Sequence, residues 1–80
     1  MKAIVHVGLK PGVLDPQGKA VADTLHRMGF AEIADARIGR VIELDLGDTT
    51  DTAAAEARVR EMCEKLLANT VIESYRVEIA

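Results

Sequence analysis

The chain has 80 residues, 49% of them hydrophobic, and a formal net charge of −3, which fits a single domain over residues 1–80. With one Phe, one Tyr, no Trp and no basic stripe, it lacks the surface that nucleic-acid binding needs. Because it has no apolar run near the roughly 20 residues of a membrane span, no signal segment before its first strand and only one cysteine, we expect a cytoplasmic protein without membrane contacts.

The N-terminal part predicts a strand followed by a helix. Residues 2–10 alternate in polarity, as a strand with one apolar face does. The helix begins at Asp15, a good N-cap, and at Pro16, whose missing N–H costs nothing in the first turn. Gly29 is a typical C-terminal stop. The stripe expected to pack on the sheet is Val21, Ala22, Leu25 and Met28.

The segment 33–46 is extended well beyond the usual strand length of about six residues. Gly39 can supply a bulge or bend, so we favour one long strand kinked near Gly39, with a split into two strands as the alternative. Arg40 falls on the apolar parity of this segment. A guanidinium there needs a carboxylate or carbonyl partner, which another chain could provide.

A second helix is predicted after a short polar break. Thr50 or Asp51 can cap it, and it runs to about residue 68, where Asn69 would end it in a left-handed turn. Its expected buried stripe is Ala55, Val59, Met62, Cys63 and Leu66.

The last predicted strand, 71–79, completes an α+β two-layer sandwich. The order strand, helix, long strand, helix, strand places two helices on one face of a mostly antiparallel sheet. The residues of the last strand expected to point inward are Val71, Tyr75, Val77 and Ile79. Apolar residues also remain on the other face of the sheet, at Ile4, Val41 and Ile72, so we expect a second copy to pack there.

No catalytic, cofactor-binding or metal-binding constellation is evident. Cys63 lies on a buried stripe and is expected to be an inert core thiol. His6 and His26 are too far apart for ligand spacing, although an interface or pH-sensitive role for His6 is a minor alternative. Lys19 follows Gly18 but lacks the Ser or Thr that completes a phosphate loop. We therefore expect no catalytic residues in this chain.

Three stretches resemble the PurS family. Residues 12–20 resemble its entry to the first helix, residues 36–40 with Glu43 resemble its long strand, and residues 67–75 resemble its closing helix and strand. Together they cover about the whole chain in order. One departure is Thr70, which stands where the family has proline, so the turn before the last strand is expected to be less rigid.

The resemblance implies a subunit of phosphoribosylformylglycinamidine (FGAM) synthase, a purine-biosynthesis ligase that uses glutamine, ATP and magnesium. In that family PurL performs the ATP-dependent amidation, PurQ releases ammonia from glutamine, and the small subunit joins them without binding a cofactor. The implied partners are PurL, PurQ and further copies of this chain, as a dimer or a dimer of dimers. The candidate interface residues are Asp15, Gln17, Gly18, Arg37, Gly39, Arg40 and Glu43.

Two other functions remain open from the residues alone. A free-standing ferredoxin-like regulatory module could bind an amino acid or nucleotide at a dimer interface, and it would show a ligand-induced rise in melting temperature. A small independent enzyme could use His6, Glu43 and Asp45, and a multi-substrate screen would detect it. The charges between residues 37 and 45 also fit a solvated edge that discourages aggregation.

Overall fold

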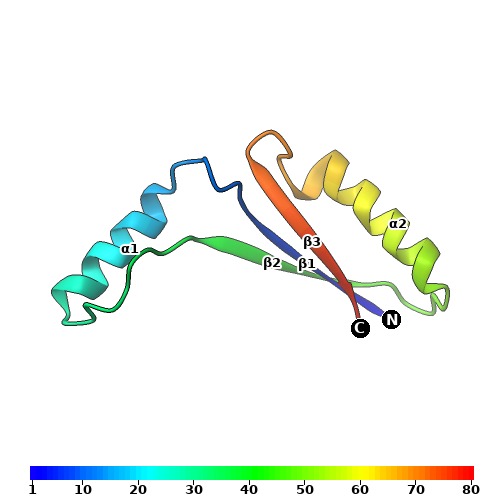
Figure 1. The fold of residues 1–80 in the computed structure, drawn as a ribbon. Coiled ribbons are helices and arrows are strands. Elements are labelled where there is room, and N and C mark those ends of the chain that lie inside the picture. Colours follow the sequence, from blue (N-terminus) through cyan, green and yellow to red (C-terminus); the bar gives the residue numbers. More distant parts are fainter.

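The computed structural model describes residues 1–80 and confirms the α+β class and the predicted order of elements (Figure 1). Three antiparallel strands form the sheet, and two helices follow the first and second strands along the chain. The elements are β1 (Lys2–Leu9), α1 (Pro16–Arg27), β2 (Gly39–Asp45), α2 (Thr52–Met62), a π-helical turn (Cys63–Leu67) and β3 (Glu73–Ile79).

The strand order is β2-β1-β3, so β1 is central. Val5 lies opposite Ile42 on one side and Val77 on the other. The apolar parity of β1 is buried because α2 covers that face of the sheet (Figure 1). The buried core consists of Ala3, Val5, Val7, Val59, Cys63 and Ala68.

The end of α2 differs from the prediction because the helix closes in a π turn. The Ala68 N–H donates to the Cys63 carbonyl at 3.1 Å, a spacing of five residues. The wider turn shifts the phase of the side chains, so Leu66 is 83% exposed, whereas Leu67 packs on the core. The predicted burial of Leu66 was therefore wrong, and Met62 is also exposed.

The turn before β3 is formed without a left-handed residue. Asn69 was expected to adopt that conformation, but no non-glycine residue has a positive φ. Its side-chain Oδ1 instead accepts a hydrogen bond from the Val71 N–H at 3.2 Å. β3 consequently begins at Glu73, later than predicted, and Val71 is 81% exposed instead of pointing inward.

α1 does not lie on the sheet, in contrast to the predicted layer of two helices. It makes no substantial contact with any strand or with α2, and it stands beyond one end of the sheet (Figure 1). We call residues 11–36 the arm. The molecule measures 48 × 24 × 14 Å with a radius of gyration of 16.0 Å, against about 12 Å for a compact chain of this length. α2 alone therefore covers the sheet.

The long extended segment is neither one kinked strand nor two strands. β2 begins at Gly39, because the ladder with β1 ends at the pair Gly8 and Gly39. Residues 33–38 pair with no strand and return along α1, where the His26 ring contacts the Ile33 carbonyl. Gly39 therefore marks the start of the strand. The returning segment contacts α1 at Gly18 and His26, while Val21 and Met28 of the predicted stripe stay exposed.

The helix starts are as predicted. Asp15 caps α1 with Pro16 in its first turn, and Asp51 caps α2 by accepting from the Ala54 N–H at 3.1 Å. Gly29 ends α1 with φ +100°, a conformation that favours glycine. Neither helix combines the length and apolar composition of a membrane span.

Candidate functional site

The arm meets the sheet at a junction that gathers most of the predicted interface residues. Two hollows flank Gly39 there, with volumes of about 320 Å³ and 510 Å³. Asp15, Gln17 and Arg40 line the first, and Arg37 lines the second. The structure thus brings together residues that are far apart in the sequence. Glu43 lies elsewhere, in the middle of β2.

Asp15 occupies the centre of the junction and is only 6% exposed. Its Oδ1 accepts from the Gly18 N–H at 2.8 Å, and its Oδ2 accepts from the Ile38 N–H at 2.7 Å. These two hydrogen bonds favour the charged form and lower the pKa of the Asp15 carboxyl. The carboxylate therefore joins the first turn of α1 to the residue before β2.

Gly18 faces the returning segment at close range. A Cβ at Gly18 would collide with the Ala36 carbonyl. Beside this contact, the Arg37 guanidinium donates to the Lys10 carbonyl at 3.0 Å, which ties the segment to the end of β1. Glycine at position 18 is therefore required by the approach of another part of the same chain.

Arg40 has the carboxylate and carbonyl partners that its position demands, and both belong to this chain. Its Nη1 and Nη2 donate to Glu73 Oε2 at 2.7 Å and Oε1 at 3.2 Å, and Nη2 also donates to the Leu67 carbonyl at 2.5 Å. The paired Arg40 lowers the pKa of Glu73, whose Oε1 additionally accepts from the Asn69 N–H. Arg40 thus holds β2, β3 and the end of the π turn together.

The lowered pKa values of Asp15 and Glu73 predict a loss of stability in acid. Such carboxylates stabilise the fold above their unfolded pKa of about 4, and the contribution disappears as the pH falls through the lower folded values. Urea unfolding midpoints should therefore fall between about pH 5 and pH 2. A variant carrying Asp15→Asn and Glu73→Gln should show a shallower fall, and parallel curves would contradict the assignment.

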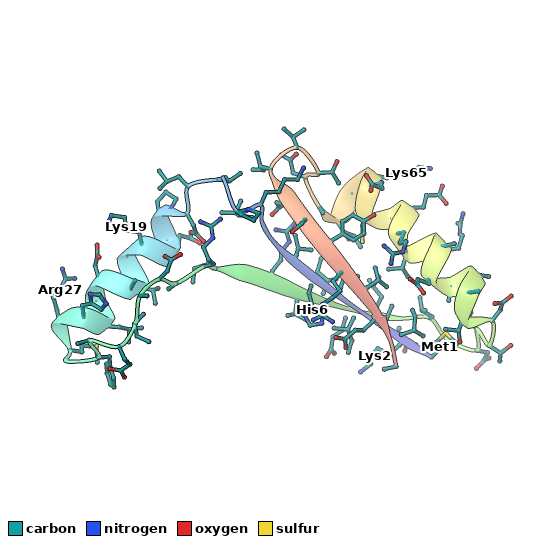
Figure 2. All side chains as sticks on the ribbon, viewed as in Figure 1. Met1, Lys2, His6, Lys19, Arg27 and Lys65 are labelled. Atoms are coloured by element: carbon teal, nitrogen blue, oxygen red, sulfur yellow. The ribbon has the colours of Figure 1, made fainter.

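The face of the sheet away from α2 carries mostly polar side chains. Lys2 and His6 are labelled in Figure 2. Lys2 Nζ lies 3.6 Å from Glu43 Oε2, and His6 Nε2 lies 3.2 Å from Glu78 Oε1. Glu78 also contacts Arg76, which lowers the Glu78 pKa. No helix covers this face (Figure 1). Glu43 is exposed on this face and separate from the junction.

The cysteine and the potential metal ligands do not assemble a reactive group. Cys63 is fully buried, and burial raises the pKa of its thiol, which keeps it protonated and unreactive. No three side chains of His, Cys, Asp or Glu lie close enough together to hold a metal ion. An interface role for His6 stays a prediction. The junction offers charges and backbone groups for binding but no nucleophile paired with a base.

Sequence reasoning missed Glu73 as a member of the junction. The sequence did contain an indication of this role. Glu73 has the same inward-facing parity on β3 as Tyr75 and Val77, and Arg40 has the same inward-facing parity on β2 as Ile42. Two opposite charges on the inward parity of strands that flank the same central strand indicate an internal ion pair. The Lys10 carbonyl, bound by Arg37, carried no such signal.

Almost the whole chain matches one family model. That model, described as PurS: phosphoribosylformylglycinamidine (FGAM) synthase, matches residues 2–80. The chain belongs to the PurS family. The FGAM synthase subunit PurS of Bacillus subtilis is 53% identical over 98% of this chain and 90% of its own length. The structure of the B. subtilis protein superposes with a TM-score of 0.82 at 52% identity, covering 96% of this chain and 94% of that one.

More distant PurS structures share the same fold. The Methanocaldococcus jannaschii PurS, described as a subunit of formylglycinamide ribonucleotide amidotransferase in the purine biosynthetic pathway, is 34% identical with a TM-score of 0.86, covering 96% of this chain and 92% of that one. A chain of the PurLQS structure from Thermotoga maritima is 28% identical with a TM-score of 0.86, covering 96% and 93%. The PurS family therefore provides a subunit of an enzyme complex of purine biosynthesis, as the resemblance implied.

Proposed function

We propose that this PurS chain is the non-catalytic assembly subunit of FGAM synthase and bridges the PurL synthetase and the PurQ glutaminase. The observation that carries the proposal is the elongated shape, with an arm projecting from a small sheet, in a family that includes a chain of a PurLQS structure. A protein of this shape has a large surface for its size and little interior in which to enclose a substrate. It acts in the cytoplasm as one PurS-like domain over residues 1–80.

The bridging role serves the transfer of ammonia. Ammonia released from glutamine at one site must reach the second site before it escapes or is protonated in bulk water. Holding the two subunits in fixed register raises the effective concentration of this intermediate. The complex is thus a glutamine-hydrolysing, ATP-dependent ligase that uses magnesium, while the PurS chain itself binds no cofactor and takes no part in bond breaking.

The PurS chain also associates with itself, as a dimer or a dimer of dimers. Because α1 lies apart from the sheet, several apolar side chains of the arm stay exposed, among them Val21, Met28 and Phe30. The sequence predicts a second copy on the sheet face with Ile4, Val41 and Ile72, and a copy that also covers the arm would bury apolar surface that this fold cannot bury alone. The contacts with PurL, PurQ or the second copy involve the junction residues and Glu43.

Reconstitution of the synthase tests the proposal directly. PurL and PurQ mixed with glutamine, ATP and magnesium should gain glutamine-dependent turnover when the PurS chain is added, and the three proteins should co-elute. Turnover of PurL with added ammonia should not depend on the chain, because ammonia then needs no transfer. Recovery of the chain alone under all these conditions, or equal dependence of both activities on it, would contradict the bridging role.

A further inference from the structure

The orientation of the arm relative to the sheet depends on contacts where the arm joins the sheet. α1 makes no substantial contact with the strands or with α2, so helix packing against them cannot orient it. The chain enters the arm after β1 and leaves it before β2 (Figure 1). These two points of the chain lie beside each other, because Asp15 and Ile38 are hydrogen-bonded there. Within one chain, a fixed angle between arm and sheet therefore depends on bonds between these two points.

Two side chains make these bonds. Asp15 accepts from the Gly18 N–H and the Ile38 N–H, which links the start of α1 to the approach to β2. Arg37 donates to the Lys10 carbonyl, which links the same approach to the end of β1. We call Lys10, Asp15, Gly18, Arg37 and Ile38 the elbow. Within the elbow, the buried Asp15 carboxylate connects the arm to Ile38, the residue before β2.

Asp51 shows what an aspartate does when it caps a helix without such a link. Asp51 caps α2 by accepting from Ala54 at 3.1 Å, and it is exposed with no side-chain bond to another part of the chain. Asp15 makes the equivalent capping bond and adds the bond to Ile38 across 23 residues of sequence. The second bond is therefore beyond what capping α1 requires.

We propose that Asp15 is a positioning residue that sets the angle between the arm and the sheet of PurS. A partner that touches both parts then meets a surface already in its bound arrangement, which reduces the entropy lost on assembly. Without the bond to Ile38, the arm would sample several orientations about its base. The consequence for the assembled enzyme rests on the bridging function proposed above, whereas the effect on the arm does not.

Residual dipolar couplings of backbone amides test the angle itself. In the wild-type chain, the couplings of α1 and of the three strands should fit one common alignment. Asp15→Ser retains a good N-cap, but its single hydroxyl oxygen cannot hold both amides in the wild-type geometry. We expect the α1 couplings of Asp15→Ser to shrink and to lose the common fit, while the strand couplings stay unchanged.

The matched control is Asp51→Ser, which changes the cap of α2 and should leave the α1 couplings at their wild-type values. Asp15→Ala serves as a second variant with the same expected loss of the common fit. The proposal is overturned when the α1 couplings of folded Asp15→Ser still fit the alignment of the strands. The orientation of the arm would in that case be set by another contact, such as one with a second copy.

Activity provides a separate readout. In the reconstituted synthase, misplacing the arm should lower glutamine-dependent turnover by up to about 100-fold and leave ammonia-dependent turnover unchanged. Asp51→Ser should have neither effect. If wild-type PurS gave no glutamine-dependent gain, the bridging function would fail, but the couplings would still decide whether Asp15 orients the arm.

Discussion

Arg40→Glu is expected to lower the glutamine-dependent turnover of the reconstituted synthase by roughly tenfold or more. The substitution removes a two-point contact with Glu73 and places two carboxylates face to face, and it also removes the donor to the Leu67 carbonyl. The π turn and the start of β3 then lose their connection to β2. Ammonia-dependent turnover of PurL should remain, because the proposed function assigns the reacting groups of that step to PurL.

A charge exchange separates the internal role of Arg40 from a contact with a partner. Combining Arg40→Glu with Glu73→Arg restores an ion pair within the chain. If Arg40 acts only inside the fold, the double variant should recover both the urea midpoint and the glutamine-dependent turnover. If Arg40 also touches PurL or PurQ, the midpoint should recover but the turnover should not. Equal loss of glutamine-dependent and ammonia-dependent turnover in Arg40→Glu would contradict the assembly role.

The parts of the fold that depend on local pattern were predictable from the sequence. Period-two alternation located β1, and the Asp15-Pro16 pair and Asp51 located both helix starts. The class followed from the order of the elements. The place of α1 did not follow, because an apolar stripe shows that a helix face is covered but not what covers it. In this chain the returning segment 33–38 approaches α1 at Gly18, whereas Val21 and Met28 of the predicted stripe stay exposed.

The remaining differences come from interactions between distant residues or from backbone details. A π turn inserts one extra residue into the helical phase, and no residue between 63 and 67 announces it, so Leu66 was assigned to the wrong face. Segment 33–38 has strand-like composition but lies past the end of β1, so it finds no ladder partner. The sequence named Asp15 and Arg40 as candidate interface residues, and their contact with a partner stays a prediction. The partners of both side chains within this chain required the structure.

Gly18→Ala should destabilise the fold by about 1 to 3 kcal/mol, the usual cost of overpacking. Helix propensity alone predicts the opposite sign, since alanine exceeds glycine by about 0.5 to 1 kcal/mol within a helix. The steric clash determines the sign of the change in the free energy of unfolding. The new Cβ would meet the Ala36 carbonyl, a backbone group that cannot rotate away as a side chain can. Moving that segment would also stretch the bond between Asp15 and Ile38.

The matched control for this substitution is Gly12→Ala, where an added Cβ meets nothing within 4 Å. Its free energy of unfolding in urea should stay close to the wild-type value. In Gly18→Ala the same measurement should show the loss, and the arm should lose its common alignment with the sheet because the returning segment is pushed away from α1. If Gly18→Ala were as stable as the wild type, the segment around Ala36 would be able to move away from α1 at little cost. The close approach at Gly18 would then not hold the elbow in place.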